Sequence, residues 1–285
     1  MQLFADYHVH TDYSDDSVYP MADVVRDAVA LGLEEICFTD HVDYGIKPDW
    51  DEPGNIVWRP GGPGEPDLMP TVNVDYPKYA AEIAALQEQY RSRITIKMGL
   101  EFGMQCHTIP RYEKLFAAYP FDFIILSVHE VENQELWTQE FQRTRTQEEY
   151  NLRYYEELLA LVKQYHHYSV LGHMDHIVRY DLQGPFPFEK IRPLAAEILT
   201  TVIADGKGIE VNTSCFRYGL PDLTPSAQIL KLYRDLGGEI ITLGSDSHKK
   251  EHVGQHIREA AGMLKELGFT SFCTFDSMQP VFHDL

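Results

Sequence analysis

The chain alternates along its length between short apolar segments typical of buried strands and amphipathic segments typical of helices. The strand-like segments are residues 3–10, 35–39, 94–100, 121–127, 168–172, 208–211 and 239–244. The helix-like segments are residues 21–31, 76–90, 108–118, 146–165, 188–205, 224–236 and 253–267. Strands that alternate with helices in this way form right-handed βα units and a parallel sheet. Because the unit recurs so often, we predict an α/β fold whose sheet is closed, or nearly closed, into a barrel.

One stretch departs from this alternation. Residues 45–74 are rich in proline and glycine and show neither strand nor helix periodicity. We predict a long irregular loop here, inserted into a single domain that covers residues 1–285. Loops of this length form lids or substrate walls in some proteins and flexible connections in others, and the sequence leaves both roles open.

The charge balance restricts the partners. The formal net charge is −20, which argues against binding to nucleic acids or anionic membranes, although a local basic pocket is compatible with it. The four cysteines form no C-x-x-C pair, the chain shows no signal peptide, and no apolar run approaches the ~18 residues that span a bilayer. We therefore expect a cytoplasmic protein. The sequence does not indicate an oligomeric state.

Residues of the types that bind metal ions follow every predicted strand. They are His8, His10, Asp40, His41, Glu101, His129, His173, Asn212, Asp246 and His248. In parallel α/β folds the carboxyl ends of the strands meet on one side, where sites are built. Histidine and carboxylate ligands without paired cysteines suit Zn, Mn or Fe. We predict a site for two to three divalent ions, with a carboxylate such as Glu101 bridging two of them, and this favours phosphate-ester hydrolysis over redox chemistry.

These residues also carry a family resemblance. The motifs are His8-Val9-His10, Thr39-Asp40-His41, Glu101, His129, His173 and Gly244-Ser245-Asp246-Ser247-His248. With these motifs in order over nearly the whole chain, the sequence resembles the polymerase-and-histidinol-phosphatase (PHP) superfamily. The resemblance implies a distorted (β/α)7 barrel with a trinuclear metal site.

The resemblance also implies how the ligands are shared. The first ion would take His8, His10, Glu101 and Asp246. The second ion would take Glu101, His129 and His173. The third ion would take His41, His248 and one carboxylate after the first motif, for which Asp15 and Asp16 are the candidates. The spacing from the first motif favours Asp16.

Within the superfamily, the sequence looks most like the monofunctional L-histidinol-phosphate phosphatases of histidine biosynthesis. Arg179 follows His173, and Arg217 follows the segment at residues 210–214, in a similar arrangement. Our hypothesis for the mechanism is that a metal-bridging hydroxide attacks the phosphate ester, and that Asp246 or His248 supplies the acid for the leaving group, since either can contact a bound water as well as a metal. We place Arg179 and Arg217 on the substrate phosphate, since a guanidinium matches phosphate oxygens, although surface salt bridges would also explain them.

The expected partners are a small phosphate ester and inorganic phosphate, with no nucleic acid and no membrane. Three other functions remain open at this point. One is a phosphatase for another small ester or for phosphotyrosine, and another is a phosphoesterase for a nucleotide or oligonucleotide. The third is a metal-binding module without catalytic activity.

Overall fold

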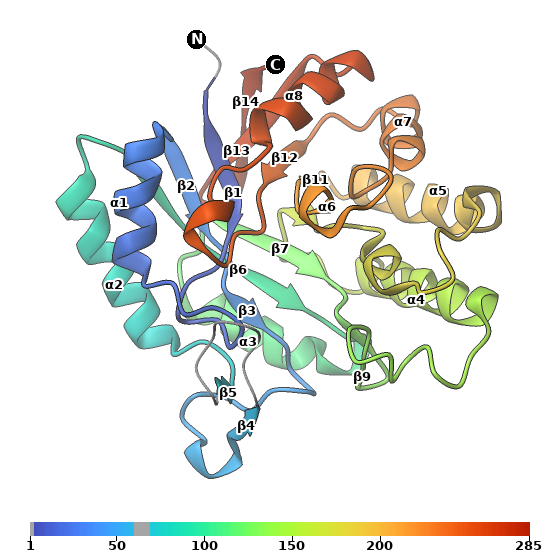
Figure 1. Cartoon of the computed structure of the whole chain (residues 1–285), viewed down its shortest axis with the longest axis horizontal. Helices are drawn as coiled ribbons and strands as arrows, with labels where there is room; N and C mark the ends of the chain where they lie inside the picture. Colours follow the sequence, from blue (N-terminus) through green and yellow to red (C-terminus); the bar gives the residue numbers. More distant parts are fainter. Residues whose placement is uncertain (1–2, 60–68) are drawn as a thin grey trace.

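The computed structural model describes residues 3–59 and 69–285, and its centre is a parallel sheet (Figure 1). The strands follow the spatial order β1-β2-β6-β7-β10-β11-β12, and each neighbouring pair is parallel. Their bounds are Ala5–Val9 (β1), Glu35–Phe38 (β2), Thr95–Gly103 (β6), Phe123–Ser127 (β7), Val170–Leu171 (β10), Gly208–Asn212 (β11) and Ile241–Gly244 (β12).

The two outer strands of this order approach each other. The Ser247 N–H donates to the His8 carbonyl over 3.2 Å, and the His10 N–H donates to the Ser247 carbonyl over 2.8 Å. These bonds join β1 to the residues after β12, so the sheet nearly closes into a barrel. The predicted fold class is therefore confirmed.

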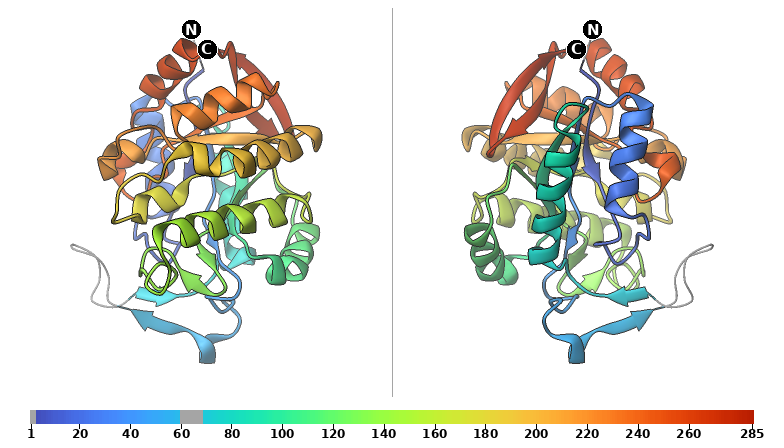
Figure 2. Two further views of the ribbon diagram at one scale, coloured as in Figure 1. Left: turned by 90° about the vertical axis from the view of Figure 1, so that its right-hand side faces the viewer. Right: turned by 90° about the vertical axis from the view of Figure 1, so that its left-hand side faces the viewer.

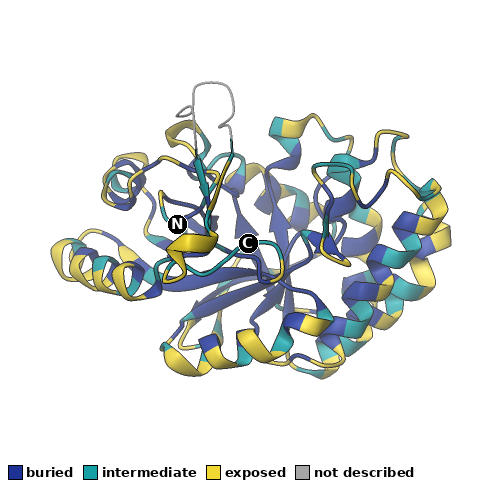
Figure 3. Cartoon of the chain, turned by 90° about the horizontal axis from the view of Figure 1, so that it is seen from below, coloured by how far each residue is buried: buried dark blue, intermediate teal, exposed yellow. Residues whose placement is uncertain are grey.

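Eight α-helices in the described residues surround the sheet. They are α1 (Met21–Leu31), α2 (Tyr76–Tyr90), α3 (Ile109–Ala118), α4 (Gln147–Val162), α5 (Phe188–Ala204), α6 (Cys215–Tyr218), α7 (Ala227–Asp235) and α8 (Ile257–Glu266). Four 3-10 helices complete them: η1 (Pro53–Asn55), η2 (Cys106–Thr108), η3 (His176–Tyr180) and η4 (Lys250–His252). The strands of the central sheet are largely buried, and the helices turn buried faces inward and exposed faces to solvent (Figure 3). Among these described helices, none has the length and apolar character that a bilayer crossing requires.

Local sequence signals explain several helix ends. Thr146 caps α4 in a capping box with Glu149, in which each side chain bonds the other residue's backbone N–H. Gly32 ends α1 in the left-handed conformation, with φ of 80°, which glycine adopts without steric cost. Asp75 accepts the Lys78 N–H at the start of α2.

The long strand β6 pairs with two different strands along its length. Its first half pairs with β2, and its second half pairs with the short strand β3 (His41–Val42). Asp40 lies at the break between β2 and β3. The register of the second pairing sets His41 directly opposite Glu101.

The insertion is more ordered than the predicted irregular loop. Strands β4 (Val57–Arg59) and β5 (Met69–Thr71) form an antiparallel pair at the end of the molecule opposite to its two chain ends (Figure 2). Proline is tolerated in such an edge strand, which explains why Pro70 does not prevent pairing. The part of the prediction on residues 60–68 lies outside the described residues.

The insertion also contacts a second segment that lies outside the βα repeat. Arg59 donates to Glu135 over 3.0 Å. Glu135 belongs to a short hairpin, β8 (Glu130–Val131) and β9 (Gln134–Glu135), which the sequence did not predict. The Arg59–Glu135 contact therefore links the insertion to this hairpin.

A C-terminal hairpin that the sequence analysis did not predict covers the other end of the barrel. It consists of β13 (Ser271–Asp276) and β14 (Gln279–Asp284). Phe275 packs against Phe123 with a ring-centroid distance of 5.0 Å, and the Phe275 N–H donates to the Tyr7 hydroxyl over 2.7 Å. Since Phe123 begins β7 and Tyr7 lies in β1, β13 closes the barrel away from the carboxyl ends of the strands.

This packing generates a stability prediction. Phe275 is 2% exposed, whereas Phe282 in the same hairpin is 50% exposed. We expect Phe275→Ala to lower the free energy of unfolding by about 3–5 kcal/mol, because the substitution removes a buried ring and leaves a cavity. Phe282→Ala should change it by less than about 0.5 kcal/mol. Urea unfolding of both variants tests this, and equal effects would show that β13 does not seal the barrel.

Candidate metal centre

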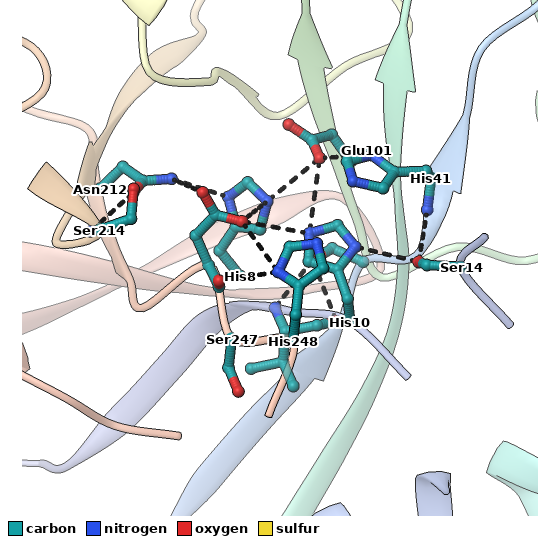
Figure 4. A network of polar contacts seen from close by, with 12 residues as sticks. His8, His10, Ser14, His41, Glu101, Asn212, Ser214, Ser247 and His248 are labelled. Atoms are coloured by element: carbon teal, nitrogen blue, oxygen red, sulfur yellow. Dashed lines mark hydrogen bonds and ion pairs between the residues drawn. The ribbon is translucent and has the colours of Figure 1, made fainter. Parts of the chain in front are cut away.

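The residues predicted to bind metal meet at the carboxyl ends of the barrel strands (Figure 4). His8 lies in β1, His41 in β3 and Glu101 in β6. The others follow strand ends within a few residues: His10, His129, His173, Asp246 and His248. The fold therefore brings side chains from distant parts of the chain into one cluster.

Four of these side chains direct one atom each toward a common point. His8 Nε2 lies 3.2 Å from Glu101 Oε2 and 3.7 Å from Asp246 Oδ1. His10 Nε2 lies 3.6 Å from each of the same two oxygens. Tetrahedral ligands at zinc bond lengths are separated by about 3.3 Å. These four separations are close to that edge length, and His8, His10 and Asp246 each offer a ligand atom within 4.8 Å of the other two.

The Glu101 carboxylate faces two groups of imidazoles. Its Oε2 points to His8 and His10, while its Oε1 lies 3.1 Å from His129 Nε2 and 2.8 Å from His173 Nε2. Glu101 is completely buried. A carboxylate placed in this way can bridge two cations, one on each oxygen.

A third group of side chains that could bind a metal ion, Asp16, His41 and His248, lies beside His10. Asp16 Oδ2 is 3.2 Å from His248 Nε2 and 3.5 Å from His41 Nε2. The imidazole of His10 stacks between those of His41 and His248, with a ring-centroid distance of 4.1 Å to each. This group is adjacent to the four-atom set around Asp246.

The neighbouring Asp15 points elsewhere. Its Oδ1 lies 2.5 Å from Lys47 Nζ, which is also 2.6 Å from Asp43 Oδ2. Asp43 Oδ1 in turn lies 2.8 Å from His129 Nδ1. Lys47 therefore holds the Asp15 carboxylate in an ion pair. Lys47 also pairs with Asp43, and the other oxygen of Asp43 contacts His129 Nδ1 and orients that ring.

The donor set fits divalent cations. The buried atom His10 Nε2 has no hydrogen-bond partner among the described residues, and His41 Nδ1 and His248 Nε2 make no well-aligned hydrogen bond although a carboxylate oxygen lies 3.0 and 3.2 Å from them. Buried polar atoms normally have a partner, because an unsatisfied one costs free energy. Imidazole nitrogens beside carboxylate oxygens are the ligands that Zn, Mn and Fe accept.

The electrostatics favour the ligand forms of these groups. Burial alone would raise the pKa of Glu101, but the imidazoles of His8, His129 and His41 hold it well below its usual range. Burial and the neighbouring imidazoles of His248 and His41 lower the pKa of His10 well below its usual value. Glu101 is therefore ionised and His10 is neutral at pH 7, the forms that bind metal.

Cations would replace protons elsewhere in the cluster. Burial lowers the pKa of His129, but the Glu101 and Asp43 carboxylates outweigh it and raise the pKa to about 10. The metal-free cluster thus carries a proton on His129 that a cation displaces.

A second layer of side chains fixes the ligands. Glu210 in β11 accepts from His8 Nδ1 and also from the His173 N–H over 2.9 Å. Ser14 Oγ lies 3.1 Å from His10 Nδ1 and donates to Asp40 over 2.7 Å. Such hydrogen bonds set the ring orientation and the tautomer of a metal-binding histidine.

The turn that carries Asp246 is held by Asp6. Asp6 accepts the Ser245 N–H and the Gly254 N–H, each over 2.8 Å. Asp246 has φ of 55°, a left-handed conformation that is costly for a residue other than glycine. The buried Asp6 carboxylate thus stabilises a strained turn that aims Asp246 at the cluster.

The two predicted substrate arginines take different positions. Arg179 Nη2 lies 3.0 Å from Asp246 Oδ2, and its guanidinium stacks on the Tyr218 ring at 4.2 Å. Arg217 donates to the backbone carbonyls of Ser245 and Asp246 over 2.7 and 2.8 Å. Both arginines border the turn after β12.

Some site residues were not found from the sequence. Glu210 lies within an apolar strand segment, and Asp43 and Lys47 lie where the insertion begins. A charged residue inside a buried strand such as β11 is a signal that could have identified Glu210, because a buried charge requires a partner. Lys47 has no such local signal.

Comparison with known families identifies the fold. The family model described as the PHP domain matches residues 6–214. The chain belongs to the PHP family. The sequence-based recognition is therefore confirmed.

Several relatives of this PHP protein are similar over nearly their full length. A histidinol-phosphatase from Lactococcus lactis is 32% identical, over 96% of this chain and 95% of that protein. A probable histidinol-phosphatase from Thermotoga maritima is 27% identical, over 93% and 92% of the two chains.

Solved structures agree with this assignment. The crystal structure of the Lactococcus lactis histidinol phosphate phosphatase, complexed with Zn, L-histidinol and phosphate, has a TM-score of 0.82 and covers 97% of this chain and 98% of that one. A structure named as the putative histidinol phosphatase of Listeria monocytogenes is 18% identical, with a TM-score of 0.73, over 90% and 99% of the two chains, and supports the fold.

The role of Glu210 in this PHP protein gives a prediction. Glu210→Gln retains the size of the side chain but removes the charge that orients His8. We expect metal affinity to fall by about 10–100-fold, since carboxylate–histidine partners of metal sites have effects of this size. Competition with a chelator measures it, and Glu113→Gln, at a partly exposed position on α3, is the control. Unchanged affinity in Glu210→Gln would contradict a positioning role.

Proposed function

We propose that this protein hydrolyses L-histidinol phosphate to L-histidinol and phosphate. The observation that carries the proposal is the bridging position of Glu101, with imidazoles on both of its oxygens. A relative that is 32% identical over nearly the whole chain has been solved with Zn, L-histidinol and phosphate, which supports both the metal and the substrate.

We assign the metal ligands in three groups, for two to three ions of Zn, Mn or Fe. The first ion is held by His8, His10, Glu101 and Asp246. The second ion is held by Glu101, His129 and His173. The third ion is held by Asp16, His41 and His248, and the contact of Asp15 with Lys47 supports the choice of Asp16. Divalent ions bound in this way supply Lewis acidity and lower the pKa of a water nucleophile.

The two arginines would bind the phosphate. Arg179 contacts Asp246 and is held flat against Tyr218, so its guanidinium is pre-oriented beside the centre. Arg217 uses two of its five N–H donors on backbone carbonyls, and the others remain for phosphate oxygens. Fixed guanidinium groups stabilise the charge that develops on the equatorial oxygens.

The leaving alkoxide requires a proton. Asp246 and His248 lie on the turn after β12, and His248 Nδ1 is 3.0 Å from the Asp246 carbonyl. The His248 side chain is 19% exposed, whereas that of Asp246 is 6% exposed. We propose that one of these two side chains delivers the proton to the leaving group, directly or through a bound water.

We further propose that residues 1–285 form a single domain that works in the cytoplasm on a small phosphate ester. All four cysteines are free thiols, as is usual in a reducing compartment. The net charge of −20 disfavours a nucleic-acid substrate.

A substrate panel tests the reaction. The protein, supplied with Zn, Mn or Fe, is assayed on histidinol phosphate, p-nitrophenyl phosphate, phosphotyrosine, AMP and single-stranded DNA. We expect kcat/KM on histidinol phosphate to exceed that on the aryl phosphate by about a thousandfold or more, because a site shaped for one leaving group rejects others. Glu101→Gln should abolish turnover and lower metal content, while the control Glu113→Gln, at a partly exposed position, should do neither.

Other results would contradict the proposal in different ways. A ratio near one between histidinol phosphate and the aryl phosphate would refute the substrate. A preference for phosphotyrosine, AMP or DNA would indicate another member of the phosphoesterase group. Full activity of Glu101→Gln would refute the metal centre itself.

A further inference from the structure

A cavity lies outside the metal centre, between α4, η3, α5 and α7. Its volume is about 240 Å³, and none of the described residues that line it is among the proposed metal ligands. A cavity of about 150 Å³ holds a benzene molecule. This cavity therefore has room for an aromatic ring with a short substituent.

The walls of the cavity are largely apolar. They include Tyr155 from α4, Phe188 and Ile191 from α5, Ile229 from α7, and Phe186. Tyr155 is 2% exposed and Ile229 is 1% exposed. Walls of this kind favour a flat apolar body, and a few polar groups then fix its orientation.

The polar lining is acidic. Asp175, Asp181 and Asp222 line the cavity, and no lysine or arginine does so within the described part of the chain. Asp181 accepts the Tyr150 hydroxyl over 2.7 Å, and Asp222 accepts the Ala227 N–H over 3.0 Å. Both of these carboxylates therefore already have partners within the fold.

Asp175 differs from the other two carboxylates. It is 7% exposed, and its Oδ2 accepts the Ser226 N–H over 2.8 Å. Its Oδ1 is buried and has no hydrogen-bond partner among the described residues. A buried acceptor without a donor costs free energy, which a ligand with an N–H group would recover.

We propose that this cavity binds a small primary ammonium compound with an aromatic body. The ammonium group donates to Asp175 Oδ1, and the ring lies among Tyr155, Phe186 and Phe188. A ligand carboxylate would meet three aspartates and no cation of the lining, so anions are excluded and amino-acid zwitterions are disfavoured. The site is separate from the metal centre and does not depend on the reaction proposed there.

Isothermal titration of the metal-loaded protein tests this, with benzylamine as the probe and saturating inorganic phosphate present. Benzyl alcohol and benzoate are the matched neutral and anionic probes. We expect benzylamine to bind about tenfold or more tightly than benzyl alcohol, as a charge-assisted hydrogen bond implies. Benzoate should not bind.

Substitutions at two positions locate the site. Asp175→Asn should weaken benzylamine binding by about tenfold. Gln228 lines the cavity from an exposed position on α7, so Gln228→Lys should fold normally and weaken benzylamine by charge repulsion, while Gln228→Met should not. If Asp175→Asn fails to fold, the pair at Gln228 decides.

Three results would overturn the proposal. One is the absence of benzylamine binding, or equal affinity for benzylamine and benzyl alcohol. Another is an unchanged benzylamine affinity in Gln228→Lys. The third is loss of binding when phosphate is present, which would place the amine in the metal centre. All of these are binding measurements, so a failure of histidinol phosphate hydrolysis would leave them unaffected.

Discussion

The Glu101 carboxylate is the constraint on which the rest of the site depends. It is completely buried, and its two oxygens face imidazoles on opposite sides. A buried charge is stable only with close partners of opposite charge. The barrel supplies imidazole partners from the ends of three strands, β1, β7 and β10, and the register between β3 and β6 adds His41 directly opposite. The carboxyl end of the barrel is therefore organised around this carboxylate and the imidazoles that face it.

The surrounding structure holds the ligands in place by a second set of charges. Glu210 orients His8, Asp43 orients His129, and Asp6 stabilises the turn of Asp246. Lys47, from the start of the insertion, forms ion pairs with both Asp43 and Asp15. The insertion thus contributes to the geometry of the centre as well as to the surface around it.

The barrel and the convergence of the ligand-type residues followed from the sequence, because strand and helix periods alternate and each strand ends in such a residue. The terminal hairpin did not, since β13 and β14 fall outside the βα repeat. Glu210 was hidden within a strand pattern. The different surroundings of Asp15 and Asp16 depend on Lys47, which lies 32 residues along the chain from Asp15, and local spacing contains no information on such a contact.

Anomalous diffraction from crystals of the zinc-loaded protein tests the bridging role of Glu101 most directly. We predict peaks on both sides of the Glu101 carboxylate, one among His8, His10 and Asp246 and the other beside His129 and His173. The two should be about 3.5–4 Å apart, as in other two-metal sites. A single peak, or two peaks that Glu101 does not join, would contradict the bridged centre.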